Sequence, residues 1–143
     1  MLRPVLVLDS DEAYPDGKGK EYYLNLLVNE STPYHDAIPD MLKTYDPVTG
    51  LWPESPGYSF GTIQMLLDWA APLKRAGIDI IAGNPILQKA AMAVFPWMDD
   101  AANMVVFGDS RGGSANFQTF ENLLAYYAGI TDKAGMEKVA SAL

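Results

Sequence analysis

The sequence contains no cysteine and a single histidine, His35. The absence of cysteine excludes disulfide bonds, thiolate metal sites and a cysteine nucleophile, so folding rests on packing of the core. A histidine metal site would need carboxylates to complete it, and His35 is better interpreted as a residue that caps or packs. We expect neither a metal nor a cofactor.

Basic residues are also few, because ten Lys and Arg stand against eighteen Asp and Glu and give a formal net charge of -8. A nucleic-acid backbone would be repelled by this charge, so we expect no nucleic-acid partner. Long hydrophobic runs are missing as well. The run at residues 5–8 is far shorter than the roughly 20 residues that a bilayer-spanning helix needs, so we expect no membrane segment.

The 143 residues are 49% hydrophobic and 20% charged, which is the composition of one globular domain. Apolar residues recur at helical spacing through most of the chain. The strongest pattern predicts a helix over residues 58–76, kinked by Pro72 and stopped at Gly77. Only residues 104–107 resemble a strand, and an isolated strand is not stable. We therefore predict an all-α fold. The other predicted helices begin near residue 20, near residue 38, after Asn84-Pro85, near residue 117 and after residue 132.

Two loops rich in Gly, Pro, Ser and Asp, at residues 46–57 and 107–116, interrupt the helices. The second contains Gly-Asp-Ser-Arg-Gly at residues 108–112, which matches the nucleophile turn of serine hydrolases. In that architecture a histidine follows the serine, and no histidine follows Ser110. We therefore interpret the two glycines as residues of a tight turn that lets backbone approach another group.

The first loop leads directly into the strongest predicted helix. Two prolines stiffen it, and its glycines leave room for other groups. Tyr58 is expected at the mouth of that helix, near the positive end of the helix dipole, where a phenolate is favoured. Trp52, Phe60 and Trp69 offer flat apolar faces of the kind on which sugar rings stack, although for any one of them we favour a place in the core.

These residues carry a resemblance to a known family. The stretch Y-D-P-V-T-G-L-W-P-E-S-P-G-Y, residues 45–58, resembles the Y-x-P-D-G-x-x-P-E-G-P-G-Y signature of the heparinase II/III-like polysaccharide lyases, which include oligo-alginate lyases. Phe-Gly-Asp-Ser at residues 107–110 resembles an F-G-D-S turn between later helices of the same family. The matched region runs from about residue 38 to residue 124.

The resemblance implies an incomplete α/α toroid, a ring of paired helices, acting on an acidic polysaccharide or oligosaccharide. Tyr58 would then be the catalytic acid or base in β-elimination on a uronic acid, in which the C5 proton is removed and the C4 oxygen leaves. Four further residues are expected to contact the sugar: Trp52, Glu54, Arg111 and Asn116. The base needs partners, because the substrate carboxylate must be neutralised before the weakly acidic C5 proton can be removed.

The sequence departs from the family in what surrounds these motifs. The asparagine and histidine that neutralise the carboxylate in the family lie on an earlier helix, and a β-sandwich domain follows the toroid. We find no match for either and expect residues 1–143 to be one helical segment of the toroid, with little activity alone, or a remnant that kept the fold and lost the chemistry. Exposed helix faces of such a segment favour self-association.

Two other functions are compatible with the same residues. A helical carbohydrate-binding or protein-interaction module would bind without chemistry, and its sugar affinity would not change with Tyr58→Phe. A toroid glycoside hydrolase would use two carboxylates, such as Asp46 and Glu54, and would produce no unsaturated sugar. Fold analogy cannot separate a lyase from a hydrolase.

Overall fold

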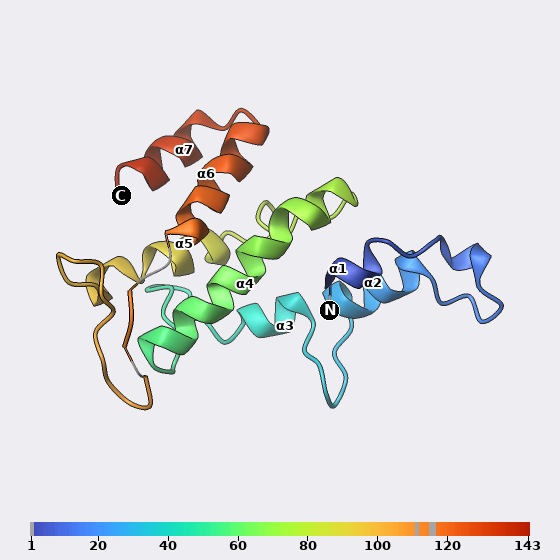
Figure 1. Ribbon diagram of the computed structural model, residues 1–143, viewed down its shortest axis with the longest axis horizontal. Coiled ribbons are helices and arrows are strands. Elements are labelled where there is room, and N and C mark those ends of the chain that lie inside the picture. The colour runs from blue at the N-terminus through green and yellow to red at the C-terminus, as the bar shows by residue number, and fades with distance from the viewer. Residues whose placement is uncertain (1, 111, 115–116) are drawn as a thin grey trace. The chain divides into compact units, whose positions relative to one another are not determined.

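The computed structural model describes residues 2–110, 112–114 and 117–143 and confirms an all-α protein (Figure 1). These residues form no β-strand and make only isolated bridges, so residues 104–107 stay extended without a sheet. The chain divides into two compact units, Met1–Thr44 and Tyr45–Leu143. None of the described helices is long and apolar enough to cross a membrane.

The described residues of the first unit, 2–44, form three helices and one 3-10 turn. Both α1 and α3 contact α2, and so does η1. Residue Gly19 precedes α2 and has no side chain to cap it, but Asp11 Oδ1 accepts hydrogen bonds from the N–H groups of Gly19 (2.8 Å) and Tyr22 (3.0 Å). A carboxylate brought from a distant turn thus caps this helix. The elements are α1 (Leu2–Val5), η1 (Asp11–Ala13), α2 (Lys20–Asn29) and α3 (Ile38–Leu42).

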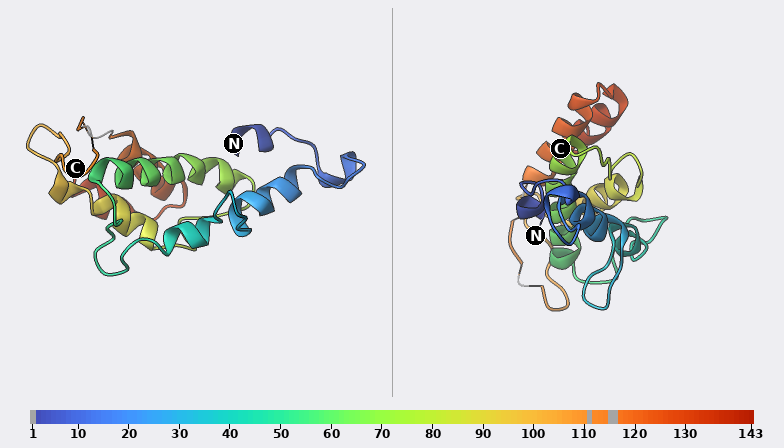
Figure 2. Two further views of the ribbon diagram at one scale, coloured as in Figure 1. Left: turned by 90° about the horizontal axis from the view of Figure 1, so that it is seen from below. Right: turned by 90° about the vertical axis from the view of Figure 1, so that its right-hand side faces the viewer.

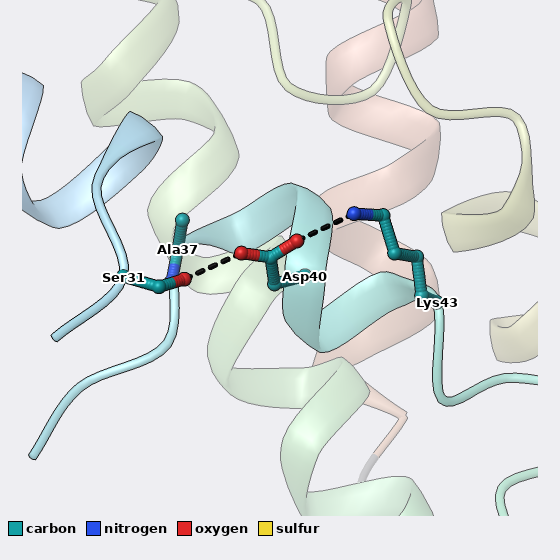
Figure 3. A network of polar contacts seen from close by, with 4 residues as sticks. All are labelled: Ser31, Ala37, Asp40 and Lys43. Atoms are coloured by element: carbon teal, nitrogen blue, oxygen red, sulfur yellow. Dashed lines mark hydrogen bonds and ion pairs between the residues drawn. The ribbon is translucent and has the colours of Figure 1, made fainter. Parts of the chain in front are cut away.

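A second polar network fixes the start of α3 (Figure 3). The Ser31 hydroxyl donates to Asp40 Oδ2 and accepts the N–H of Ala37, the residue that precedes the helix. Lys43 Nζ lies 2.6 Å from Asp40 Oδ1. Lys43 and then Ser31 hold the pKa of Asp40 below its usual value. His35, in the same segment, packs as expected, with its Nε2 donating to the carbonyl oxygen of Leu27 at 3.2 Å.

The second unit is built around a 20-residue helix, α4 (Pro56–Arg75). Helices α5 (Ile86–Met92) and α6 (Gln118–Gly129) both run along it, and α7 (Lys133–Ala140) folds back on α6 (Figures 1 and 2). A 3-10 turn, η2 (Phe95–Trp97), follows α5. The apolar stripe of α4 is buried as its spacing predicted. Its buried apolar residues include Ile63, Leu66, Leu67, Ala70 and Leu73.

Aromatic packing closes the core between α4 and α6. The ring of Phe120 is fully buried and lies 4.7 Å from the ring centre of Phe95 and 6.1 Å from that of Phe60. Beside this cluster Asn122 Nδ2 donates to Asp68 Oδ1 at 2.6 Å. Helix α4 therefore contacts α6 near its start through Phe60 and near its middle through Asp68.

Local contacts define several helix ends. The α3 helix ends at Leu42, and a turn at Lys43 and Thr44 follows it. Asn84 does not cap α5, since its side chain donates to the carbonyl oxygen of Ile80. Gly129 is the last residue of α6 and not the left-handed residue after it. Thr131 takes that conformation, with φ 58°.

Candidate functional site

The loop before α4 is closed by Asp46. Its Oδ1 accepts hydrogen bonds from the N–H groups of Val48 (3.0 Å) and Thr49 (2.6 Å) and from the Thr49 hydroxyl (2.8 Å). The N–H of Thr49, followed by its hydroxyl, holds the pKa of Asp46 below its usual value. Asp46 is therefore an ionised turn residue. The glycoside-hydrolase alternative needs one carboxyl group that carries a proton to donate, and Asp46 does not suit that role.

This loop is tied to α5 by Lys89. Lys89 Nζ donates to the carbonyl oxygen of Pro47 at 2.7 Å. Gly50, with φ +77°, lies against the backbone of Lys89, and a Cβ at this position would be 2.8 Å from the Lys89 carbonyl oxygen. The glycine is required because both the backbone angle and the space exclude a side chain. The loop thus brings Trp52 to a fixed position.

Trp52 packs against Tyr45 at the base of the loop. The ring centres lie 4.8 Å apart at an interplanar angle of 73°, an edge-to-face contact. Tyr45 is buried, burial raises its pKa, and its hydroxyl has no hydrogen-bond partner among the described residues. Trp52 keeps part of its ring exposed.

That exposed part belongs to a pocket with a cavity volume of about 60 Å³. The ring centres of Trp97 and Phe107 lie 5.2 Å apart on its wall. The space is too small to enclose a sugar, since enclosing ligand sites are several hundred Å³. A sugar ring could only lie against the aromatic side chains at the edge of this pocket. The pocket is lined by Leu51, Trp52, Glu54, Pro56, Ser59, Ala93, Val94, Trp97 and Phe107.

The two motifs that carry the family resemblance meet beside this pocket, at the N-terminus of α4. A Cβ on Gly57 would lie 2.9 Å from Ser110 Oγ. Gly108, with φ +63°, lies against Ser55, whose Cβ would be 3.7 Å from a Cβ at position 108. The two glycines at positions 108 and 112 predicted a tight turn at which backbone approaches another group. The turn at residues 107–110 makes such an approach to the first motif.

The predicted site residues are only partly brought together. Trp52 and Glu54 line the pocket. Tyr58 is 55% exposed on the first turn of α4, adjacent to Gly57 but outside the pocket lining. Arg111 and Asn116 lie outside the described residues. No group of three or more acidic or histidine side chains in the described ranges could hold a metal ion.

Trp97 and Ser59 also line the pocket, although neither was predicted from the sequence. Ser59 is on the first turn of α4, one turn after Ser55, so helical spacing could have placed both on the same side. Trp97 reaches the pocket because η2 redirects the chain after α5. The proline at position 96 is the one sequence signal of that turn.

Comparison with known proteins gives no relative for this chain. No family model matches it, and neither a characterised protein nor a solved structure shows significant similarity.

Proposed function

We propose that the chain is a helical segment of a polysaccharide lyase that cleaves uronic-acid-containing polysaccharide by β-elimination, with Tyr58 as acid or base. The observation that carries the proposal is the meeting of the two resembling motifs. Gly57 and Ser110 are 53 positions apart, yet the backbone of one lies against the hydroxyl of the other. Motifs that resemble one family and converge on one point support a common site.

The surroundings of Tyr58 support a role at a sugar. Its exposed ring leaves the phenol accessible to a polymer, and the neighbouring wall of Trp52, Trp97 and Phe107 suits the apolar face of a sugar ring. Tyrosine has an ordinary pKa of about 10 and can act at either end of a proton transfer when its environment tunes it. The proposed fold around this site is part of an α/α toroid.

A second function is favoured by one feature of the pocket. Among the described residues of its lining there is no Lys, Arg or His, so these residues supply no cation to neutralise a substrate carboxylate. A module that binds carbohydrate without cleaving it would need none. For the lyase, the same feature predicts little turnover by this chain alone.

One experiment separates the two functions. Uronate oligosaccharides of the heparan and alginate types, and a neutral glucan of equal length, are titrated against the chain and its Tyr58→Phe variant. The ultraviolet absorption of a 4,5-unsaturated uronate is then followed with the 143-residue chain and with any longer form that the gene encodes. Tyr22→Phe is the control, because Tyr22 is another partly exposed helical tyrosine, outside the pocket lining.

The lyase proposal predicts uronate binding and a chromophore that Tyr58→Phe abolishes and Tyr22→Phe preserves. Binding that Tyr58→Phe leaves unchanged, with no chromophore from any form, would contradict the lyase and support the binding module. Failure of every oligosaccharide to bind would exclude both functions.

A further inference from the structure

The N-terminus of α4 carries hydrogen-bond donors that the described part of the chain does not use. Pro56 has no N–H, and the first helical bond is that from the N–H of Ser59 to the carbonyl oxygen of Ser55. The N–H groups of Gly57 and Tyr58 have no acceptor among the described residues. Two backbone donors therefore point out of a 20-residue helix at the positive end of its dipole.

An independent observation at the same point is the side chain of Ser55. This residue precedes α4 with extended backbone angles, φ −61° and ψ 152°, from which a serine ordinarily caps the helix. Its side chain makes no capping bond, the residue is only 5% exposed, and Oγ has no partner in the described ranges. A buried hydroxyl without a partner is unfavourable and calls for an acceptor.

We propose that this helix N-terminus binds the carboxylate of an acidic sugar whose ring lies against the aromatic wall of the pocket. The donors are the N–H groups of Gly57 and Tyr58 and the hydroxyl of Ser55. This inference rests on the proposed function, because it assigns the uronate carboxylate to a place in the same site. It gives the chain a way to recognise the charge without a basic side chain.

The two motifs pack closely at the helix start. Ser110 Oγ occupies the space beside Gly57, and Gly108 lies against Ser55. Ser110 Oγ, beside Gly57, is a further donor within the same small region. Ser59 and Pro56, on the first turn of α4, line the pocket and connect it with the helix start.

Two carboxylates near the helix start oppose an anion. Glu54 lines the pocket and Asp109 lies in the turn at residues 107–110. Both side chains are exposed, so water and salt screen their repulsion, while the N–H groups act at contact distance. Affinity for an acidic sugar should consequently rise with moderate salt, up to the point at which salt also screens the helix dipole.

The test compares methyl glucuronoside with methyl glucoside, which has the same ring without the charge, and with sodium acetate at equal ionic strength. Amide shifts and affinities are measured by nuclear magnetic resonance for the chain and for Ser55→Ala. Ser141→Ala is the control, since Ser141 follows α7 and its hydroxyl donates to the carbonyl oxygen of Lys138, away from the pocket lining. Gly57→Ala places a methyl group against Ser110, and Gly61→Ala, with open space around it, is its control.

We expect glucuronoside to shift the amides of Gly57 and Tyr58 and to bind more tightly than glucoside or acetate. Ser55→Ala should lower the affinity for glucuronoside about tenfold, because one hydrogen bond to a charged group is lost. The affinity for glucoside should stay within about twofold. Gly57→Ala should lower the affinity for glucuronoside, and Gly61→Ala should leave it unchanged. Thermal unfolding confirms that each variant is folded.

Other results overturn the inference in different ways. Equal affinity for glucuronoside and glucoside, or for glucuronoside and acetate, would refute the carboxylate site. Preference for glucuronoside with unshifted amides at residues 57–58 and no effect of Ser55→Ala would place the carboxylate elsewhere and leave the proposed function standing. If neither sugar binds, the carboxylate site and the proposed function are both refuted.

Discussion

The hydroxyl of Tyr126 on α6 donates a hydrogen bond to Asp79 Oδ1 in the segment after α4. Lys74 joins this pair, with Nζ 3.1 Å from Asp79 Oδ2 and 4.2 Å from the ring centre of Tyr126. The network links the C-terminal end of α4 to α6. It lies outside the pocket lining, so its effect is expected on stability and not on sugar binding.

The pH dependence of stability follows from this network. Burial alone would raise the pKa of Asp79, but hydrogen bonds from the N–H of Ala82, from Tyr126 and from Lys74 together hold it below its ordinary value. A carboxyl whose pKa is lowered by folding stabilises the protein above its unfolded pKa of about 4, and this stabilisation is lost as pH falls through the folded pKa. Burial, and then Asp79, raise the pKa of Tyr126, so the phenol keeps its proton beyond pH 10.

We therefore expect Tyr126→Phe to lower the free energy of unfolding by about 1–2 kcal/mol at pH 7 and by less at pH 3. Urea denaturation at both pH values measures the difference. Tyr127→Phe is the control, because the neighbouring hydroxyl makes no hydrogen bond within the described ranges. A loss that is equal at the two pH values would show that Asp79 is not the partner that matters.

The packing of α7 on α6 depends on a glycine. A Cβ on Gly135 would lie 2.5 Å from Cδ1 and 2.7 Å from Cε1 of the buried Tyr127 ring, whereas one on Gly129 would meet nothing within 4 Å. Gly135→Ala should destabilise the protein by about 1–3 kcal/mol through overpacking. Gly129→Ala should be neutral or stabilising by up to about 1 kcal/mol.

Thermal unfolding followed by circular dichroism compares the two variants. Similar midpoints for both would mean that α7 can move away from Tyr127 at no cost, and the close packing would then not contribute to stability.

The role assigned to Asp46 distinguishes a turn residue from a catalytic acid. Asparagine keeps an oxygen that can accept from Val48 and Thr49, so Asp46→Asn should leave glucuronoside affinity within about twofold. Asp46→Ala removes the acceptor and should loosen the loop, lowering both affinity and the urea midpoint. If asparagine were as harmful as alanine, the carboxylate itself would be needed, as in the hydrolase alternative.

The aromatic wall should contribute to sugar affinity through Trp97. Trp97→Ala removes the ring that contacts Phe107 and should weaken methyl glucuronoside and methyl glucoside alike, by about two- to tenfold. Trp97→Phe should restore most of the affinity. Calorimetric titration gives both values, and Trp69→Phe, outside the pocket lining, serves as control. Unchanged affinity in Trp97→Ala would mean that sugars do not rest on this wall.

The sequence was informative where structure is local. The apolar spacing of residues 58–76 predicted the buried stripe of α4, and Asp132 caps α7, accepting from the N–H of Gly135 as the helix prediction after residue 132 implied. Pro72 lies inside α4 without ending it. Because Pro72 is in the last turn, its missing N–H removes only one helical hydrogen bond, and the buried stripe holds the rest of the helix in place.

Contacts between residues far apart in the chain could not be predicted from the sequence. Asp11 caps a helix that begins nine positions later, and Ser110 meets Gly57 only because the turn at residues 107–110 packs against α4. The two motifs could be identified separately, but their convergence depends on packing of the whole second unit. Trp97 was missed for the same reason, because its place in the pocket is set by η2 and not by a periodic pattern.

All residues of the pocket wall fall within residues 51–107, inside the second compact unit. The pocket lining is thereby encoded in one contiguous stretch of the gene. A contiguous stretch of this kind can be inherited, duplicated or exchanged between helical scaffolds as one unit. A recombination event between the codons of Trp52 and Trp97 would separate these two lining residues, and the pocket would be lost.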